Sequence, residues 1–483
     1  MNKGEDLFRR RFQRIAVLSC LCAFFITAVM SCSDQSRQSG SSPAASVGSE
    51  SATSGLNMPA GLPQPVISGN MPLAIPAIPP NVTTPEQARP FFDYFSWQEF
   101  IALNWPAASG SRGVPDQPNN PQVFKAAANG SPVVWGAYRN ALDLFESGNQ
   151  RPPAWDAPAP ANGICAKAPP GVKVFEMTAK GSTVLDDVNE SFSYPLIDQF
   201  KHYASFEITF NQVQYDFIRG QDSDPTTWRY LLKNITKPVT MPSSNPPNTQ
   251  GSIMLKAAWR EMVQGKDDFS RYYVIDALVY DLQTKTCQPK KMGLVGFHIV
   301  QKLQAFPQWI WSTFEQIDNV ERHSGVPASV PLSFNNGTNN PPTIGGYANK
   351  PPNKSPDLQP IDKRVPVQVT RLNPIPTTPA SASTVDINRI YQQLLAGTVW
   401  QYYELVFTQW PSQPDKFTLM EKGGVYPNDC GVAFPANGIT NTTMETYFQS
   451  PSDAVGAGGN SCMSCHYRAD STDFSWALKR RAH

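Results

Sequence analysis

The stretches YYVIDALVY (residues 272–280) and GLVGFHIV (residues 293–300) decide the fold of this chain. Much of the first stretch alternates between apolar and polar side chains, which is the period of a strand with one buried face. The polar segment TKTCQP (residues 284–289) separates it from the second stretch. This arrangement predicts a β-hairpin with a moderately long loop, and therefore antiparallel structure at the centre of the chain.

Three further segments predict strands or aromatic packing around this hairpin. Phe206–Phe210 (FEITF) alternates with a period of two, as a half-buried strand does. Phe306–Phe314 (FPQWIWSTF) is a dense aromatic patch, and Val399–Trp410 has the pattern of an aromatic-rich strand.

Helical patterns occur on both sides of the predicted strands. Thr84 followed by Pro85 has the form of a helix start, because a capping residue precedes proline at the first helical position. The next segment, Phe91–Trp105, carries aromatic side chains near helical spacing, and Pro106 ends it. Other helical patterns occur at Val133–Phe145, Val385–Leu395 and Asp470–His483. With 46 prolines, the sequence predicts an α+β fold of mixed helices and antiparallel strands joined by many proline-rich loops.

The overall charge excludes one large class of partners. Forty Lys and Arg residues stand against 39 Asp and Glu residues, for a net charge of +1 at pH 7. Such a balance gives neither the basic footprint of a nucleic-acid-binding protein nor a polybasic membrane patch. We therefore expect no nucleic acid among the partners.

The first 31 residues have the pattern of an export signal. A basic segment precedes Ile15–Met30, a mostly apolar run shorter than the roughly 20 residues that a transmembrane helix needs. The ending Val29–Cys32 resembles the bacterial lipoprotein signal, in which Cys32 becomes the lipid-bearing first residue of the mature chain. This resemblance implies a periplasm-facing lipoprotein, with the outer membrane as one candidate location. An uncleaved anchor and an ordinary signal peptide are the alternatives.

The pentapeptide CMSCH (residues 462–466) is the strongest chemical signal in the sequence. Two cysteines three residues apart can each form a thioether with a vinyl group of haem, and the adjacent histidine can bind the iron. The motif predicts one covalent haem c, attached at Cys462 and Cys465, with His466 as the proximal axial ligand. Half of a zinc site is the alternative, but zinc would need two further Cys or His ligands at similar spacing.

Composition divides the chain into five segments. The Ser-, Gly-, Ala- and Pro-rich stretch after the signal has almost no aromatic residues and predicts a disordered spacer. A second stretch rich in Pro, Ser, Asn and Thr is too long for a compact connection, so we expect an extended arm or a boundary between two units. The predicted segments are a signal peptide (1–31), a spacer (32–83), a mixed α+β region (84–323), an arm or linker (324–380) and a haem-binding region (381–483).

Four stretches resemble a group of large bacterial cytochrome c-type proteins. They are DYFSWQEFIALNWP (93–106), GLVGFHIVQK (293–302), PQWIWSTFEQIDNV (307–320) and SCMSCHYRADSTDFSW (461–476). The resemblance covers most of the mature chain and implies an exported protein with covalent haem. It implies no reaction, because no activity is assigned to that group.

The sixth position of the iron has several candidate ligands. No methionine follows His466, so an axial methionine would have to come from upstream, and Met444 is the candidate. His298, on the predicted second strand of the hairpin, is the candidate for a distal ligand or pocket residue. Core packing is the alternative for both. Weaker candidates are His202, His323 and His483, and the sixth position can also stay open.

Two classes of function follow from that choice. A six-coordinate haem favours electron transfer, in which the protein supplies a potential and a docking surface for redox partners that the sequence does not identify. An open position favours a haem enzyme or a gas- or small-molecule-binding protein, and the C-terminal haem motif resembles that of the c-prime cytochromes. We expect an electron carrier; if the protein is an enzyme, a haem-dependent oxidoreductase is expected.

Cysteines outside the motif give a weaker prediction. Cys20 and Cys22 lie in the signal peptide, Cys32 is the predicted lipid site, and the motif contains Cys462 and Cys465. The remaining cysteines are Cys165, Cys287 and Cys430. An oxidising compartment favours pairing, and we prefer Cys165 with Cys287 because both lie in the central region.

Overall fold

The chain divides into two units, Met1–Gly55 and Leu56–His483, and every described residue lies in the second. The predicted signal peptide and Cys32 lie outside the described residues. Within the described part, no helix combines the length and the apolar character needed to cross a bilayer. The computed structural model describes residues 58–145, 151–158, 165, 168–169, 172–175, 194–220, 239–281, 284–322, 329–337, 352–354, 364–414, 433–435, 440–449, 461–466, 469 and 472–481.

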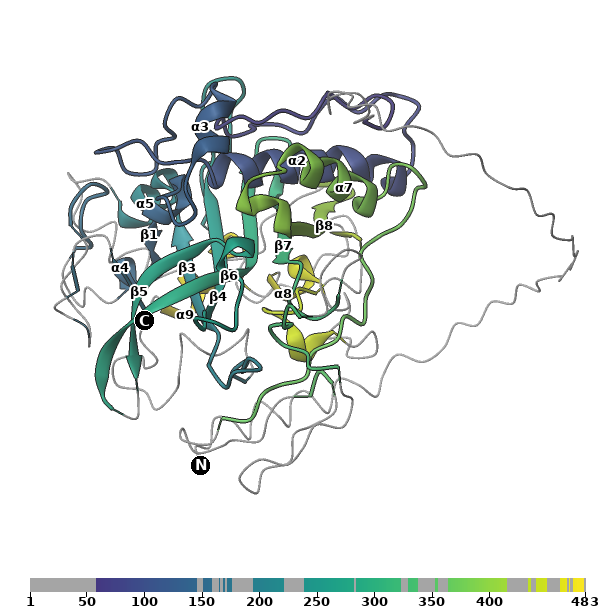
Figure 1. Cartoon of the computed structure of the whole chain (residues 1–483). Helices are drawn as coiled ribbons and strands as arrows, with labels where there is room; N and C mark the ends of the chain where they lie inside the picture. The colour runs from purple at the N-terminus through teal and green to yellow at the C-terminus, as the bar shows by residue number, and fades with distance from the viewer. Residues whose placement is uncertain are drawn as a thin grey trace, which may run out of the picture. The chain divides into compact units, whose positions relative to one another are not determined.

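A largely antiparallel sheet forms the centre of this unit, as Figure 1 shows. Its main path runs β1-β3-β4-β6-β7-β8-β9, while β5 pairs with β6 and, in parallel, with β2. Helices accompany the sheet, so the predicted α+β class is confirmed. The described strands are β1 (Arg139–Asn140), β2 (Lys173–Phe175), β3 (Ser205–Phe210), β4 (Ile253–Glu261), β5 (Val274–Asp281), β6 (Thr286–Leu303), β7 (Phe306–Gln316), β8 (Tyr403–Pro411) and β9 (Ala433–Phe434).

The predicted hairpin is present as β5 and β6, but its loop is shorter than expected. Asp281 pairs with Thr286, so β6 begins seven residues before the predicted Gly293. The segment is polar because this end of β6 is largely exposed, and exposure rather than a turn explains its composition. The Cys165–Cys287 disulfide fixes β6 near its start, which confirms the preferred pairing.

Helix α2 (Pro85–Leu103) is buried between the sheet and helix α7 (Thr384–Leu394), and both helices lie along one side of the sheet in Figure 1. Thr84 caps α2 in a capping box with Gln87, as the predicted helix start required. Trp97 shows how the layers join, since its ring lies 5.1 Å from that of Phe314 on β7 and stacks 5.0 Å from that of Tyr391 on α7. Aromatic side chains therefore fill both sides of this helix.

Shorter helices complete the described structure. They are α3 (Pro121–Ala126), α4 (Ala141–Phe145), α5 (Gln212–Arg219), α8 (Cys462–His466) and α9 (Trp476–Arg481), with 3₁₀ turns η1 (Val134–Ala137), η2 (Phe269–Arg271), η3 (Val399–Tyr402) and η5 (Thr446–Phe448).

The predicted helix over Val133–Phe145 is wrong. That segment forms η1, the two-residue strand β1 and the short helix α4. Tertiary contacts decide the outcome: Val133 bridges to Pro106, and Arg139 pairs with Phe210 at the edge of the sheet. Apolar residues at helical spacing in so short a segment stabilise a helix only weakly. The tertiary contacts therefore determine its conformation. Similarly, the predicted strand at Val399 begins with η3 and becomes extended only at β8.

The predicted disordered spacer (32–83) is wrong for residues 58–83, which are part of the folded unit. Residues 58–83 lie against α2, where the backbone carbonyls of Gln64 and Val66 accept hydrogen bonds from Tyr94 and Gln98 at 3.3 and 3.1 Å. Ser244 likewise donates to the carbonyl of Leu73 at 2.9 Å. Side chains of the segment also pack on the core, with Ile67 buried in it. The rest of the predicted spacer lies outside the described residues.

The described parts of segment 324–380 form an extended arm rather than a boundary between units. Val367 and Val369 are buried, and their N–H groups donate to the carbonyls of Ile197 and Phe334. Beyond the arm, β8 pairs with β7 in the same sheet. The predicted 381–483 region therefore completes the central sheet instead of forming a separate unit.

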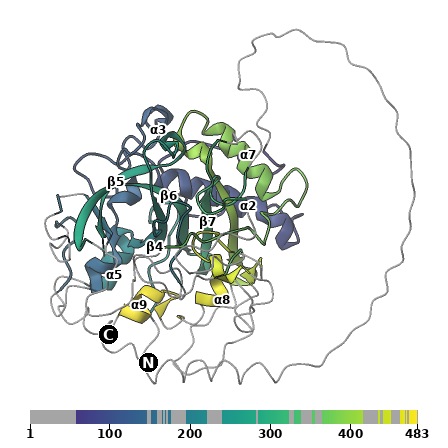
Figure 2. The ribbon, with the colours of Figure 1, turned by 60° about the horizontal axis from the view of Figure 1, so that its bottom comes forward.

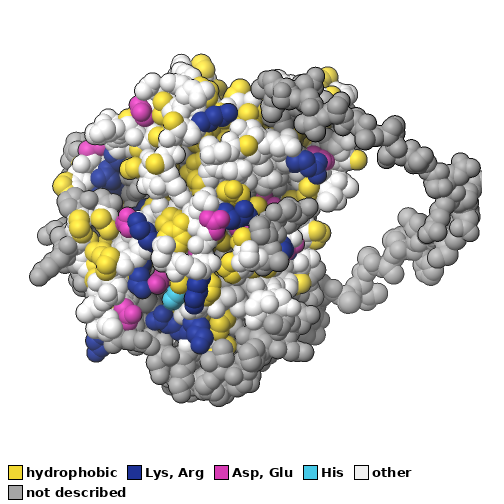
Figure 3. Space-filling model, viewed as in Figure 1, with side chains coloured by type: hydrophobic (Ala, Val, Ile, Leu, Met, Phe, Trp, Pro, Cys, Tyr) yellow, Lys and Arg dark blue, Asp and Glu magenta, His cyan; other side chains and the backbone are white. Residues whose placement is uncertain are grey.

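Charged side chains of both signs share the surface of this unit. Figure 3 shows Lys and Arg close to Asp and Glu over much of the face viewed. Two ion pairs illustrate this: Lys290 of β6 lies 2.7 Å from Glu261 at the end of β4, and Lys291 of β6 lies 2.8 Å from Asp276 of β5. The exposed pair between Lys291 and Asp276 contributes little to stability.

Candidate haem site

Successive side chains of β7 point to opposite faces of the sheet. On one face, Ser312 bonds Ser96 of α2 at 2.7 Å. On the other, Trp311 packs its ring 4.5 Å from that of His466, and Thr313 accepts a hydrogen bond from Asn441 at 2.9 Å. Figure 2 shows α8 and α9 on the side of the sheet away from α7. The haem motif thus lies on the face that the helical layer leaves uncovered.

Helix α8 presents the two cysteines of the motif from a single turn. Cys462 and Cys465 are half-buried thiols, three residues apart and so on one side of the helix. Met463 between them is fully buried, and its N–H donates to Oε1 of Gln409 on β8 at 2.8 Å. The buried methionine anchors the helix to the sheet, while the cysteines keep partial access.

His466 has the environment of a metal-binding histidine. Its Nδ1 lies 2.7 Å from the backbone carbonyl of Phe474, so Nδ1 carries the proton and the lone pair of Nε2 is available. Burial lowers the pKa of His466 to about 4, which keeps the ring neutral at pH 7. A neutral imidazole with one nitrogen fixed by a carbonyl is the form that binds iron.

The residues of this site therefore fit a covalent haem. Among the described residues, no group of three or more His, Cys, Asp or Glu side chains could hold a metal ion alone. A haem iron takes four nitrogens from its porphyrin and needs only one or two ligands from the protein. One histidine beside two thiols meets that requirement.

His298 lies on the same face of the sheet as the motif. It pairs across the sheet with Lys256 on β4 and Thr313 on β7. Its Nε2 is 3.0 Å from Oε1 of Glu445. His298 and Glu445 therefore lie on the side of the sheet where Trp311 packs against His466.

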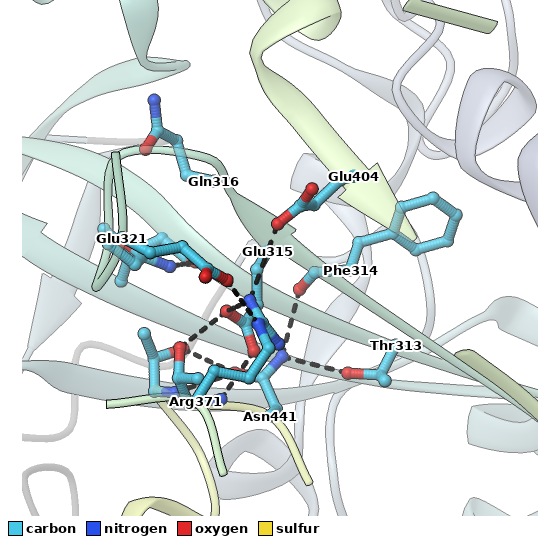
Figure 4. Close-up of polar contacts among 12 residues, drawn as sticks. Thr313, Phe314, Glu315, Gln316, Glu321, Arg371, Glu404 and Asn441 are labelled. Atoms are coloured by element: carbon cyan, nitrogen blue, oxygen red, sulfur yellow. Dashed lines mark hydrogen bonds and ion pairs between the residues drawn. The ribbon is translucent and has the colours of Figure 1, made fainter. Parts of the chain in front are cut away.

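Glu445 is positioned by the loop 440–445, which Figure 4 shows at its attachment to the sheet. Asn441 donates to Thr313 at 2.9 Å and to the carbonyl of Phe314 at 3.0 Å. Thr442 donates to both carboxylate oxygens of Glu315, through its N–H and its hydroxyl, at 2.5 Å each. These bonds fix the backbone just before Glu445.

An arginine from the arm holds Glu315 in turn. Arg371 donates to Glu315 at 2.9 Å and to Glu321 at 2.7 Å, and lies 3.5 Å from Glu404 (Figure 4). Burial opposes the charge of Arg371, but the surrounding carboxylates raise its pKa. Burial likewise raises the pKa of Glu315, and the guanidinium opposes that shift. The arm therefore supports the loop 440–445 through a buried ion pair.

The other candidate ligands have different surroundings. Met444 is fully buried among apolar side chains that include Leu196, Val295 and Val367, which is its core-packing alternative. His202 lies 3.6 Å from Asp198 and 3.8 Å from Glu261. His323 and His483 are outside the described residues.

Sequence reasoning missed the groups that hold His466 and His298. The acceptor for His466 is the backbone carbonyl of Phe474, which no side-chain pattern reveals. Glu445 is one acidic residue among many until the fold brings it to His298. The sequence places Trp311 in a dense aromatic patch, but no feature of the sequence indicates that this patch contacts the motif.

No protein-family model, curated protein or solved structure matches this chain. The function is therefore inferred from the site itself.

Proposed function

We propose that this chain is an exported, membrane-tethered monohaem c-type cytochrome that transfers electrons. Cys462 and Cys465 hold the haem covalently, and His466 is its proximal axial ligand. The observation that carries the proposal is the hydrogen bond from His466 Nδ1 to the carbonyl of Phe474, since it leaves Nε2 available beside two thiols. When bound, the haem supplies an iron that changes oxidation state by one electron.

The surrounding residues suit this task. Trp311 packs against His466 and limits solvent access to its ring, and Met463 anchors the helix that carries both cysteines. An iron site held by a rigid sheet face rearranges little when an electron arrives, so the protein sets the potential and offers a docking surface.

Location follows from the N-terminal signal. Lipidation of Cys32 would tether the protein to a periplasm-facing bacterial membrane, of which the outer membrane is one candidate. The Cys165–Cys287 disulfide supports an oxidising compartment, because disulfides persist outside the cytoplasm.

A second function has one observation in its favour. Nε2 of His298, the nitrogen by which histidine usually reaches haem iron, is bonded to Glu445, and Met444 is buried in a separate apolar cluster. If neither side chain binds the iron, the sixth position takes a small molecule, with His298 beside it as a hydrogen-bonding group. The protein is then a gas- or small-molecule-binding cytochrome or a haem-dependent oxidoreductase.

The deciding experiment is the optical spectrum of the purified full-length protein, oxidised and reduced, with and without carbon monoxide. Haem that survives acid-acetone extraction supports the attachment, and its absence contradicts the whole proposal. Sharp low-spin bands that carbon monoxide leaves unchanged support electron transfer. A high-spin spectrum that shifts with carbon monoxide supports the second function.

A further inference from the structure

A buried ion pair is formed by Asp473, the residue that precedes Phe474, whose carbonyl His466 contacts. Lys302, near the end of β6, donates its Nζ to the carboxylate of Asp473, the residue before Phe474. The two side chains are 1% and 0% exposed. Burying both charges is costly, so the pair persists only with good geometry and further hydrogen bonds.

Asp473 has those further bonds. The backbone N–H of Met241 donates to its carboxylate at 2.7 Å, and Nε1 of Trp309 donates to it at 3.2 Å. With Lys302, three separate segments of the chain therefore converge on one carboxylate. Their shared effect is to fix the position of the backbone at residue 473.

That backbone has an unusual conformation. Asp473 and Phe474 have φ angles of 51° and 66°, in the left-handed region that residues with a Cβ rarely adopt. Two such residues in succession store roughly 1–3 kcal/mol each and persist only where surrounding contacts determine the backbone. The contacts of Asp473 are of that kind, and the turn directs the carbonyl of Phe474 at Nδ1 of His466.

We propose that Asp473, held by Lys302, is a positioning residue that sets the reduction potential of the haem through the Phe474 carbonyl and His466. The inference rests on the proposed function, since it requires haem on Cys462 and Cys465. A fixed acceptor at Nδ1 makes Nε2 a stronger donor to the iron, which favours the ferric state. The charge of the carboxylate is largely offset by that of Lys302, so the position of the Phe474 carbonyl carries the effect. Loss of Asp473 therefore raises the potential.

The test is a redox titration of the full-length holoprotein and its Asp473→Asn variant. Asparagine keeps the size of the side chain and an acceptor, but removes the charge. We expect the ferric-to-ferrous ratio at a fixed solution potential to fall about tenfold, which corresponds to a rise of about 59 mV for one electron. A potential equal to that of the parent overturns the inference.

Asp318→Asn is the matched control. Asp318 is also fully buried and pairs with Arg271 at 2.7 and 2.8 Å at the end of β7. Its loss should lower stability and leave the potential unchanged. An equal rise of the reduction potential in both variants would show that the rise comes from a general loss of stability, and it would overturn the inference.

A second variant tests the inference if the Asp473→Asn protein folds poorly. Asp473→Asn combined with Lys302→Gln leaves no unpaired buried charge, and it should also raise the potential because the turn loses its ion pair. An unchanged potential in a folded double variant overturns the inference. Failure of the proposed function is recognised separately, because the parent itself would then contain no covalent haem.

Discussion

His298 and Glu445 form a hydrogen bond of 3.0 Å although 147 residues separate them. The bond joins the middle of β6 to a loop near the C-terminus, and both side chains retain partial exposure. Its geometry depends on how closely the loop approaches the sheet. Gly296, two residues before His298 on the same face, permits that approach.

Replacing Gly296 with alanine should therefore destabilise the protein by about 1–3 kcal/mol, the usual cost of overpacking. The added Cβ would collide with Oγ1 of Thr443 and lie 3.2 Å from Cε of Met444, so the loop would have to move. Urea unfolding measures the loss. Gly136→Ala is the control, because its Cβ meets only Cγ2 of Val133 at 3.4 Å. Equal stability of the parent and the Gly296→Ala variant would show that the loop adjusts without cost.

Replacing Asp93 with asparagine should stabilise the protein at pH 7 by about 1–3 kcal/mol. Burial raises the pKa of Asp93 to about 6, although the hydroxyls of Thr384 and Thr408 oppose the shift. The difference from the ordinary value of 3.8 corresponds to about 3 kcal/mol. Because the folded-state pKa is the higher one, this penalty is absent below pH 3.8, grows between pH 3.8 and 6, and is complete above pH 6.

Chemical denaturation of the Asp93→Asn variant from pH 4 to pH 7 measures this effect. The part of the pH dependence that lies between pH 4 and 6 should become flatter. Asp276→Asn is the control, since that side chain is 74% exposed and its replacement should leave the profile unchanged. An Asp93→Asn variant less stable than the parent at pH 7 would mean that Asp93 is charged and well solvated by its hydroxyl partners.

Replacing Cys462 and Cys465 with alanine should abolish haem that survives acid-acetone extraction, because no thioether can then form. The absorbance of the extracted protein as a pyridine haemochrome measures it. Met463→Leu is the control, since it changes the buried residue between the cysteines at similar volume and should retain haem. Covalent haem in the double alanine variant would contradict the assignment.

Replacing Cys32 with serine should move the protein from the membrane fraction to the soluble fraction, because serine cannot carry the thioether-linked lipid. Fractionation of cells that express the full-length chain measures the change, with Ser33→Ala as the control. Continued membrane retention of the Cys32→Ser protein would favour an uncleaved anchor.

Local patterns predicted the elements whose sequences carry their own signals. Thr84 starts α2 as expected, Phe206–Phe210 forms most of β3, and Val385–Leu395 nearly coincides with α7. These succeed because a cap or a periodic face is a property of neighbouring residues. The predicted haem ligands stay a prediction, although their surroundings fit it.

The elements that the sequence did not predict depend on distant partners. Val133–Phe145 has a helical stripe, yet contacts with Pro106 and Phe210 make it irregular and extended. Lys302 and Asp473 are 171 residues apart, so neither looks unusual in its own segment. Pairings over such separations leave no periodic trace in a single sequence.

The burial of α2 also constrains the order in which the protein assembles. Its Trp97 donates a hydrogen bond to Asn388, 291 residues later, and its other face needs β7 and β8. As the chain emerges from its N-terminus, this aromatic helix has no complete partner until most of the protein has been made. Contacts of such high sequence separation fold slowly and leave apolar surface open to aggregation. The CMSCH motif begins 51 residues after β8 ends, so the proposed haem attachment would come at about the time when the core closes.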